Sequence, residues 1–189
     1  MTASVEDPRY GGIIQYAFTT PDIRQAMENY VDQFGIGPWF VSGPFVPPEG
    51  LYRGQPTVMR LSLAIAFSGN RMIELIQQHD DKPSVYQELI AKRGHGFHHW
   101  AIGTRDLEGE VERFTSQGYE VVFSDRSPRG VRIAYVDTSA DFPGMTEIIE
   151  ISDDLLANYD AMLEATQTWD GRDPIRMASI ITTNHGQAS

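Results

Sequence analysis

The sequence predicts an α+β fold in which two copies of a βαβββ module share one mixed sheet, followed by a C-terminal helix. Two observations predict it. The segment at 94–107 recurs in altered form at 13–23, with Gln15 in the place of His99. Each copy then continues into an amphipathic helix and three strands, in the same order. Duplicated modules of this kind can close a shared sheet around a single cleft.

The repeat divides the chain into five segments. We expect a leader at 1–12, a first βαβββ module at 13–78, a linker at 79–96, a second βαβββ module at 97–152, and a C-terminal helix and tail at 153–189.

The first copy begins with a strand and a helix. Residues 13–18 are β-branched and aromatic and are bounded by glycines and by Thr20-Pro21, which predicts a strand. Thr20 is the expected N-cap, and Pro21 lies in the first turn of a helix that ends before Gly35. The Pro- and Gly-rich segment 43–56 is long for a connector and is a candidate rim or lid for a pocket. The remaining strands are expected at 39–42, 57–67 and 70–77.

The second copy follows a linker that holds a helical piece at 85–92. Apolar residues at helical spacing predict one further helix at 153–168, outside the repeat. This extension has two open roles, since it can cover the cleft of its own chain or contact a partner chain. The elements of the second copy are expected as a strand at 97–104, a helix at 107–117, and strands at 119–124, 131–137 and 145–151.

Composition narrows the function classes. The chain has 15 Lys and Arg against 26 Asp and Glu, a formal net charge of -11, and its basic residues form no run, so nucleic-acid binding is not expected. It has no cysteine, so a metal must be held by His, Gln, Asp or Glu. No apolar run reaches the roughly 20 residues of a membrane span, and the leader does not resemble a signal peptide. We therefore expect a cytoplasmic protein with no membrane partner.

Three motifs carry a family resemblance: Gly-His-Gly-Phe-His-His-Trp-Ala-Ile at 94–102, Met-Ile-Glu-Leu-Ile at 72–76, and Thr-Glu-Ile-Ile-Glu at 146–150. From residue 13 to 152 the chain resembles the vicinal-oxygen-chelate superfamily, which includes glyoxalase I, methylmalonyl-CoA epimerase, extradiol dioxygenases and bleomycin-resistance proteins. The resemblance implies a cup-shaped sheet with helices outside, a homodimer, and a metal held by the first and last strand of each module. Carried over by position, the metal ligands are Gln15, Glu74, His99 and Glu147.

Strand alternation supports this set, because all four residues can face the cup while bulkier residues face the helices. An imidazole, two carboxylates and an amide oxygen suit a divalent ion, zinc first, with nickel, cobalt or manganese as alternatives. On the same alternation, His98 points to the opposite face and packs between the sheet and a helix. Glu150 also has the opposite parity, although a bulge could exchange it with Glu147.

The resemblance implies a metal-dependent isomerase, epimerase or lyase that removes a proton next to a carbonyl through a metal-stabilised enolate. Glu147 is the first choice for the base and Glu74 the second. Two alternatives stay open. One is a metal-free small-molecule binding protein of the bleomycin-resistance type, and the other is a ring-cleaving dioxygenase, whose two-His, one-carboxylate site is incomplete with Gln15 in place of the first His.

The substrate is expected to be a small carbonyl-containing molecule. Aromatic and methionine side chains favour a compact, largely apolar compound. A CoA thioester would need cationic contacts, and its candidates are scattered: Arg53, Arg60, Arg126, Arg129 and Arg132. The residues expected to bind substrate are Trp39, Phe45, Tyr52, Arg53 and Tyr135.

Overall fold

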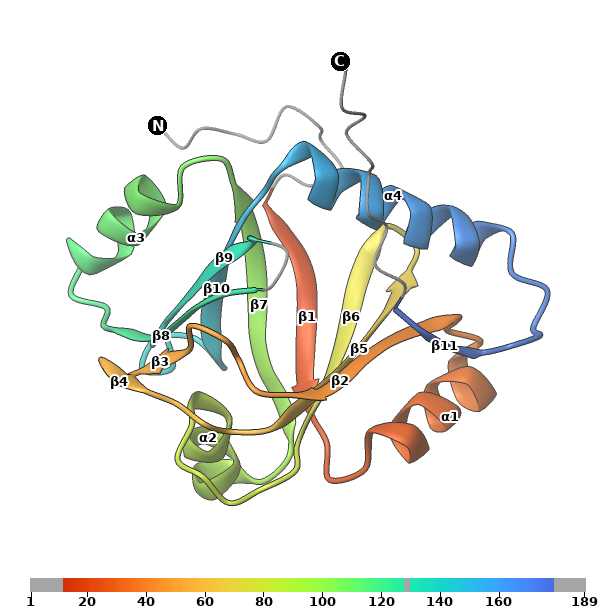
Figure 1. Cartoon of the computed structure of the whole chain (residues 1–189), viewed down its shortest axis with the longest axis horizontal. Coiled ribbons are helices and arrows are strands. Elements are labelled where there is room, and N and C mark those ends of the chain that lie inside the picture. Colours follow the sequence, from red (N-terminus) through yellow and green to blue (C-terminus); the bar gives the residue numbers. More distant parts are fainter. Residues whose placement is uncertain (1–11, 128–129, 179–189) are drawn as a thin grey trace, which may run out of the picture.

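The computed structural model describes residues 12–127 and 130–178, and it confirms the α+β fold. Within these residues, eleven strands form one curved mixed sheet in the order β11-β2-β5-β6-β1-β7-β10-β9-β8-β3-β4, which leaves β11 and β4 as free edges (Figure 1). Positions 1–11 of the predicted leader and 179–189 of the predicted tail lie outside the described residues. Among the described residues, no helix is long and apolar enough to span a bilayer.

The first module begins as the sequence predicts, but its helix is capped differently. Asp22, not Thr20, is the N-cap, and its side chain accepts a hydrogen bond from the backbone N–H of Gln25 at 3.0 Å. Pro21 therefore lies outside the helix, because Asp22, two residues after Thr20, offers the stronger acceptor. The elements of this module are β1 (Ile13–Thr19), α1 (Ile23–Phe34), β2 (Trp39–Phe45), β5 (Leu61–Ser68) and β6 (Arg71–Gln78).

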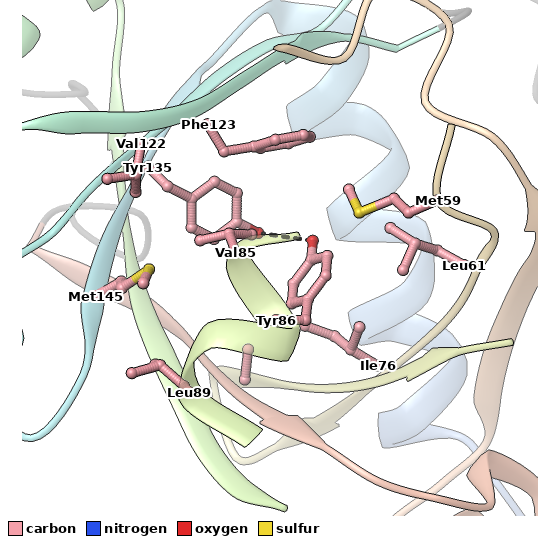
Figure 2. Close-up of a cluster of buried hydrophobic side chains, with 11 residues drawn as sticks. Met59, Leu61, Ile76, Val85, Tyr86, Leu89, Val122, Phe123, Tyr135 and Met145 are labelled. Carbon is pink, nitrogen blue, oxygen red and sulfur yellow. Dashed lines mark hydrogen bonds between the residues drawn. The ribbon is translucent and has the colours of Figure 1, made fainter. Parts of the chain in front are cut away.

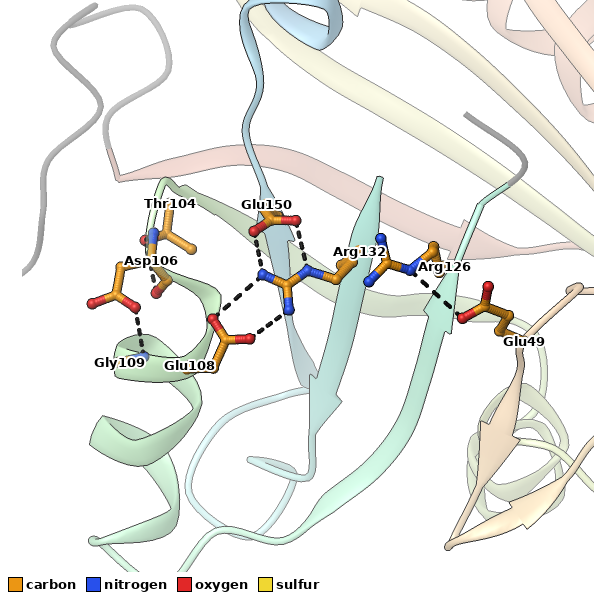
Figure 3. Close-up of polar contacts among 8 residues, drawn as sticks. All are labelled: Glu49, Thr104, Asp106, Glu108, Gly109, Arg126, Arg132 and Glu150. Carbon is orange, nitrogen blue, oxygen red and sulfur yellow. Dashed lines mark hydrogen bonds and ion pairs between the residues drawn. The ribbon is translucent and has the colours of Figure 1, made fainter. Parts of the chain in front are cut away.

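The second module repeats this plan down to the helix cap. Asp106 accepts from the backbone N–H of Gly109 at 2.9 Å, and Thr104 accepts from the N–H of Asp106 at 3.0 Å (Figure 3). Thr20 and Asp22 make the same pair of contacts ahead of α1. The elements are β7 (Gly96–Thr104), α3 (Leu107–Thr115), β8 (Val121–Arg126), β9 (Arg132–Val136) and β10 (Met145–Glu150).

The two faces of the sheet are covered by different helices. α1 packs on β5 and β6 around Ala64 and Leu75, and α3 packs on β9 and β10 around Ala134 and Ile148. These residues alternate with Ile76 and its neighbours, so we call the face under α1 and α3 the outer face and the opposite, concave face the inner face.

The two helices that belong to neither repeat lie on the inner face, whereas the repeat helices α1 and α3 lie outside, as expected. α2 (Val85–Arg93), between the modules, packs with Ala17, Ile76 and Met145 at one end of the cup. α4 (Asp153–Gln167) packs with Met72 and Ala101 at the other end (Figure 1). The cup therefore has a helix at each end of its concave surface.

Two segments extend the sheet by pairing with strands of the modules. The stretch expected to be a rim or lid contains β3 (Leu51–Tyr52) and β4 (Gln55–Pro56), and β3 pairs with β8 of the second module. After α4 the chain returns to the first module, where β11 (Ile175–Met177), which the sequence did not predict, adds to the edge of β2. The C-terminal extension therefore packs on its own chain, with α4 on the inner face and β11 at the edge of β2.

Candidate metal centre

The centre of the sheet is built from β1 and β7, which run antiparallel, each flanked by the last strand of its own module. On β1, Ala17 lies opposite Glu74 of β6 on one side and His99 of β7 on the other. These three side chains share the inner face, since directly paired residues point the same way.

The same arrangement recurs on β7. Ala101 lies opposite Glu147 of β10 and opposite Gln15 of β1. Ala17 and Ala101, like Gln15 and His99, occupy equivalent positions of the two modules. Two methyl groups thus form the floor of the site, and four polar side chains surround them, because alanine is too small to fill the space between the longer chains.

The four polar side chains converge within hydrogen-bond range. The amide nitrogen of Gln15 lies 3.1 Å from Oε2 of Glu74 and 3.3 Å from Oε2 of Glu147. The Nε2 atom of His99 lies 3.2 Å from the same Glu147 oxygen and 3.5 Å from the Glu74 oxygen. Their exposed fractions are only 0 to 6%. Four potential ligand atoms therefore meet at one buried point.

The donor set fits a divalent cation. Bonds of about 2.0–2.2 Å to nitrogen and oxygen place neighbouring ligand atoms roughly 3–3.5 Å apart, which matches the separations between His99 and the two carboxylates. Gln15 would hold an ion through its amide oxygen, which a half-turn of the amide exchanges with the nitrogen. In the described residues, Glu74, His99 and Glu147 form the group of His and carboxylate side chains that meets this geometry.

The electrostatics of the site also favour a cation. Burial raises the pKa of Glu74 well above its usual range, and the negative charge of Glu147 raises it further. Two buried carboxylates side by side reduce the stability of the fold unless a proton or a cation lies between them. A bound divalent ion would instead lower the pKa of both carboxyl groups.

Two tyrosines lie over the same part of the inner face. The ring of Tyr135 meets the His99 ring edge-on at a centroid distance of 4.9 Å, and its hydroxyl lies 3.4 Å from that of Tyr86 on α2 (Figure 2). Burial raises the pKa of both hydroxyls, and the charges of Glu74 and Glu147 add to the effect. Both hydroxyls therefore stay protonated and can donate hydrogen bonds to an oxygen in the cup.

The predicted substrate-binding residues fall into two groups. Tyr135, Phe45 and Tyr52 belong to the apolar cluster around Tyr86 on the inner face. Trp39 does not, because it is fully buried against α1 on the outer side, 5.5 Å ring to ring from Tyr30. The structure therefore separates Trp39 from the other candidates.

The charge of Arg53 is taken up by carboxylates of the protein itself. Its guanidinium forms ion pairs with Glu88 of α2 at 2.8 Å and with Glu120 at 2.9 Å, and its side chain is 36% exposed. Two carboxylates already satisfy its charge, so it links the β3–β4 hairpin to α2 and to the second module. This role requires the fold and was not visible in the sequence.

Glu150 faces the side of β10 opposite the site, as strand alternation predicts. The β7–β10 register runs from Met145 to Glu150 without a shift, and the Glu150 carboxylate pairs with Arg132, which also pairs with Glu108 of α3 (Figure 3). The guanidinium holds the pKa of Glu150 below its usual range. Glu147 is therefore the acidic residue of β10 that faces the cup.

The prediction for His98 is wrong in one respect. A register shift in the β1–β7 pair puts His98 on the same side as His99, and the two Nδ1 atoms lie 2.9 Å apart. His98 does pack between the sheet and a helix, since its Nε2 lies 3.1 Å from the carbonyl of Val85 in α2. Burial lowers the pKa of His98 well below its usual range, so the ring is neutral.

Sequence reasoning missed Tyr86 and the two alanines. Tyr86 lies in the linker helix, which has no counterpart in the repeat and so no alignment to draw attention to it. Ala17 and Ala101 coincide when the two copies are aligned, and small residues at matching strand positions were a usable signal of a cavity floor. All four polar residues come from one chain, so the site does not require a second copy, and the expected homodimer stays a prediction.

Comparison with solved structures identifies the same fold in several proteins. A hypothetical protein of Bacillus halodurans C-125 is 20% identical over 75% of this chain and 95% of its own, with a TM-score of 0.57. Methylmalonyl-CoA epimerase from Mycobacterium tuberculosis is 22% identical over 83% of this chain and 96% of its own, also at 0.57. The Streptomyces coelicolor enzyme in complex with 2-nitronate-propionyl-CoA is 22% identical over 73% and 92%, at 0.51. At these identities the likeness shows the fold alone.

No curated protein matches the chain closely enough to be compared. The family model of the Glyoxalase/Bleomycin resistance protein/Dioxygenase superfamily matches residues 14–135, which include Gln15, Glu74 and His99 and end before Glu147. This match covers more than half of the sequence, and the open cup of paired βαβββ modules agrees with it. The chain therefore belongs to the Glyoxalase/Bleomycin resistance protein/Dioxygenase superfamily.

Proposed function

We propose that this protein is a divalent-metal-dependent isomerase or epimerase that moves a proton at a carbon next to a carbonyl group. The observation that carries the proposal is the meeting of Glu74, Glu147, His99 and Gln15 at one buried point on the inner face. Buried like charges without a binding role would reduce stability, and the same groups at ligand spacing suit a cation.

A bound divalent ion would supply Lewis-acid stabilisation of the negative charge that develops on the substrate oxygen. The protein supplies the base. Glu147 takes the proton from carbon, the electron pair of the C–H bond moves toward the carbonyl oxygen, and the proton returns to a carbon to complete the isomerisation. The repeat sets Glu74 and Glu147 on opposite sides of the β1–β7 pair. Their ligand oxygens lie within 4.8 Å of each other, so both carboxylates can act at a carbon held beside the site. Proton removal on one face and return on the other is epimerisation.

The substrate that best suits the cup is compact and largely apolar. The inner face near the site carries the rings of Tyr86, Phe123 and Tyr135 and the thioethers of Met59 and Met145 (Figure 2). Tyrosine hydroxyls at this surface can bind a second substrate oxygen.

Phosphate groups find little support at the surface around the cup. Arg53 and Arg132 are each paired with two carboxylates, and Arg126 lies 3.6 Å from Glu49 (Figure 3). Arg129 lies outside the described residues. Arg60 is exposed and stays a candidate contact for a phosphate group. The pairing of Arg53, Arg126 and Arg132 favours a small carbonyl compound over a CoA thioester, although solved epimerases of the same fold are methylmalonyl-CoA epimerases.

The two alternatives are less well supported. A ring-cleaving dioxygenase needs a second histidine ligand, but both ring nitrogens of His98 already have partners in Val85 and His99. A metal-free binding protein would gain nothing from the paired Glu74 and Glu147 carboxylates. Metal analysis separates the three, because iron favours the dioxygenase and a protein without stoichiometric metal favours the binder.

The experiment that tests the proposal is metal-dependent exchange of substrate protons with solvent deuterium. Purified protein loaded with zinc, nickel, cobalt or manganese is screened against small enolisable carbonyl compounds by NMR. Glu147→Gln should reduce exchange by about 100-fold or more, the scale expected when a general base is lost, while the protein stays folded. Glu150→Gln, on the outer side of the same strand, is the matched control. Full exchange in the Glu147 variant would refute the assignment of the base.

A further inference from the structure

Two neighbouring histidines on β7 point to the same side of the sheet. In the β1–β7 pair, His99 lies opposite Ala17 and Phe97 lies opposite Phe18, and the register shifts between these pairs. His98 is therefore the extra residue of a β-bulge, which breaks the usual alternation of side chains along a strand. The Nδ1 atoms of His98 and His99 lie 2.9 Å apart, within hydrogen-bond distance.

Contacts from outside the strand hold the bulge. Arg93, the last residue of α2, donates a hydrogen bond to the carbonyl of Phe97 at 2.6 Å. On the other side, a Cβ at Gly144 would lie 2.5 Å from the carbonyl oxygen of His98, so the chain entering β10 approaches more closely than any larger residue allows. The position of the His98 ring is thus set by α2 and by β10.

The Val85 carbonyl, which contacts His98, decides which nitrogen of each imidazole ring carries the N–H. The Nε2 of His98 lies 3.1 Å from the carbonyl oxygen of Val85, and a carbonyl only accepts, so the Nε2–H of His98 donates. The His98 ring is fully buried beside the Tyr86 ring, and a neutral imidazole carries one N–H. Its Nδ1 is therefore an acceptor, and the Nδ1–H of His99 must be the donor. When the His99 ring carries a single N–H, that N–H is at Nδ1 and the Nε2 holds a lone pair.

The Val85 carbonyl, which accepts the hydrogen bond from His98, is itself held in place. Val85 is the first residue of α2, and its neighbour Ser84 is the N-cap, which accepts from the N–H of Gln87 at 3.0 Å. The Ser84 hydroxyl donates to Gln78 of β6 at 2.6 Å. The N-terminus of α2 is thereby tied to the strand that carries Glu74.

We propose that His98 is a positioning residue that holds the proton of His99 on Nδ1 and so directs the Nε2 lone pair of His99 toward Glu74 and Glu147. This role of His98 rests on the proposed function, because a divalent ion binds an unprotonated imidazole nitrogen. Without an acceptor at Nδ1, the proton of His99 can lie on Nε2, where the carboxylate oxygens at 3.2 and 3.5 Å accept it. An ion would then have to displace that proton.

Three variants test this role. His98→Phe keeps a ring of similar size and removes both nitrogens. His98→Asn keeps an acceptor, the side-chain oxygen, close to the position of Nδ1. His95→Asn changes an exposed histidine just ahead of β7 and is the control. Circular dichroism and thermal melting establish that each variant is folded.

Two measurements are made on each folded protein. Nitrogen-15 NMR of the imidazoles at pH 8.5, in a chelator, reads the His99 tautomer without any metal. Zinc titration against a competing indicator reads affinity. We expect the Nδ1–H tautomer of His99 in the wild type, its loss in His98→Phe with a fall in zinc affinity of about 10- to 100-fold, and recovery of most of both in His98→Asn. His95→Asn should match the wild type.

Two results would overturn the role of His98: an Nε2–H tautomer of His99 in the wild type, or unchanged tautomer and zinc affinity in His98→Phe. If His98→Phe does not fold, the wild-type tautomer and the His98→Asn variant decide the question. A wild type that binds no zinc, nickel, cobalt or manganese would refute the proposed function instead, and the metal-free NMR spectra would still decide whether His98 sets the tautomer.

Discussion

Replacing Glu74 by Gln should stabilise the metal-free protein and destabilise the metal-loaded one. Ligand oxygens of Glu74 and Glu147 lie within 4.8 Å of each other in a buried site. Two unit charges 4.8 Å apart repel by about 3.5 kcal/mol at an effective dielectric constant of about 20. Glu74 can take up a proton instead, so this figure is an upper value for the gain. The Glu74→Gln variant retains a side-chain oxygen that can accept from the Gln15 amide.

The pH dependence follows from the sign of the pKa shift. The pKa of Glu74 is raised in the folded state, so above the unfolded value the native state binds more protons than the unfolded state. The free energy of unfolding of metal-free wild type should therefore fall as the pH rises from about 5 to 7, by up to about 1.4 kcal/mol per pH unit from this group. The Glu74→Gln variant lacks this contribution, so its slope should be smaller.

The assay is chemical denaturation in chelator and in excess zinc. At a free zinc concentration of about 100 times Kd, the wild type gains about 2.7 kcal/mol, whereas the variant has lost a ligand and gains less. The order of stability should therefore reverse between the two conditions. Glu150→Gln is the control, because it removes a carboxylate paired with Arg132 and should not stabilise the protein. A Glu74→Gln variant less stable than wild type in chelator, or equal stabilisation of both by zinc, would refute the reasoning.

Two further predictions test the covering segments. Leu163→Ala on α4 should lower the free energy of unfolding by about 2–4 kcal/mol in urea denaturation, because Leu163 is 7% exposed and packs on the inner face. The control is Val58→Ala, which should change the free energy of unfolding little because Val58 is 63% exposed. A loss below about 1 kcal/mol in the first variant would show that α4 does not cover the cup. Arg53→Ala should cost about 1–2 kcal/mol, since Glu120 is 64% exposed but Glu88, at 20%, would lose its partner in a half-buried position. KM should not change, and a large rise in KM would restore Arg53 as a substrate contact.

The sequence predicted the repeat, most elements to within a few residues, and the four polar residues of the candidate site. These follow from local rules: strands alternate, a duplicated module puts equivalent residues in equivalent places, and Gln15 and His99 coincide when the two copies are aligned. The sequence did not predict β3, β4 or β11. The partners of β11 and β3 lie far along the chain, and the β3–β4 pair has only two residues on each strand, so no local pattern marks these elements.

The contacts of two predicted substrate-binding residues also depend on the fold. Trp39 suits a ligand cleft by residue type, but its strand presents it to α1 on the outer side. Arg53 suits an anionic substrate, but the fold brings Glu88 and Glu120 to it. Residue type sets what a side chain can do, and only its neighbours in space set what it does.

By itself the sequence determined the paired modules and placed Gln15, Glu74, His99 and Glu147 on one face, because strand alternation and duplication follow directly from residue order. The tertiary structure alone decided the meaning of His98. A bulge, which depends on the register of β7 against β1 and on the close approach of Gly144, turns His98 to the side of His99. The carbonyl of Val85, thirteen residues earlier, then sets the direction of the hydrogen bonds. Such a chain of contacts depends on the packing of separate elements, which no local sequence pattern specifies.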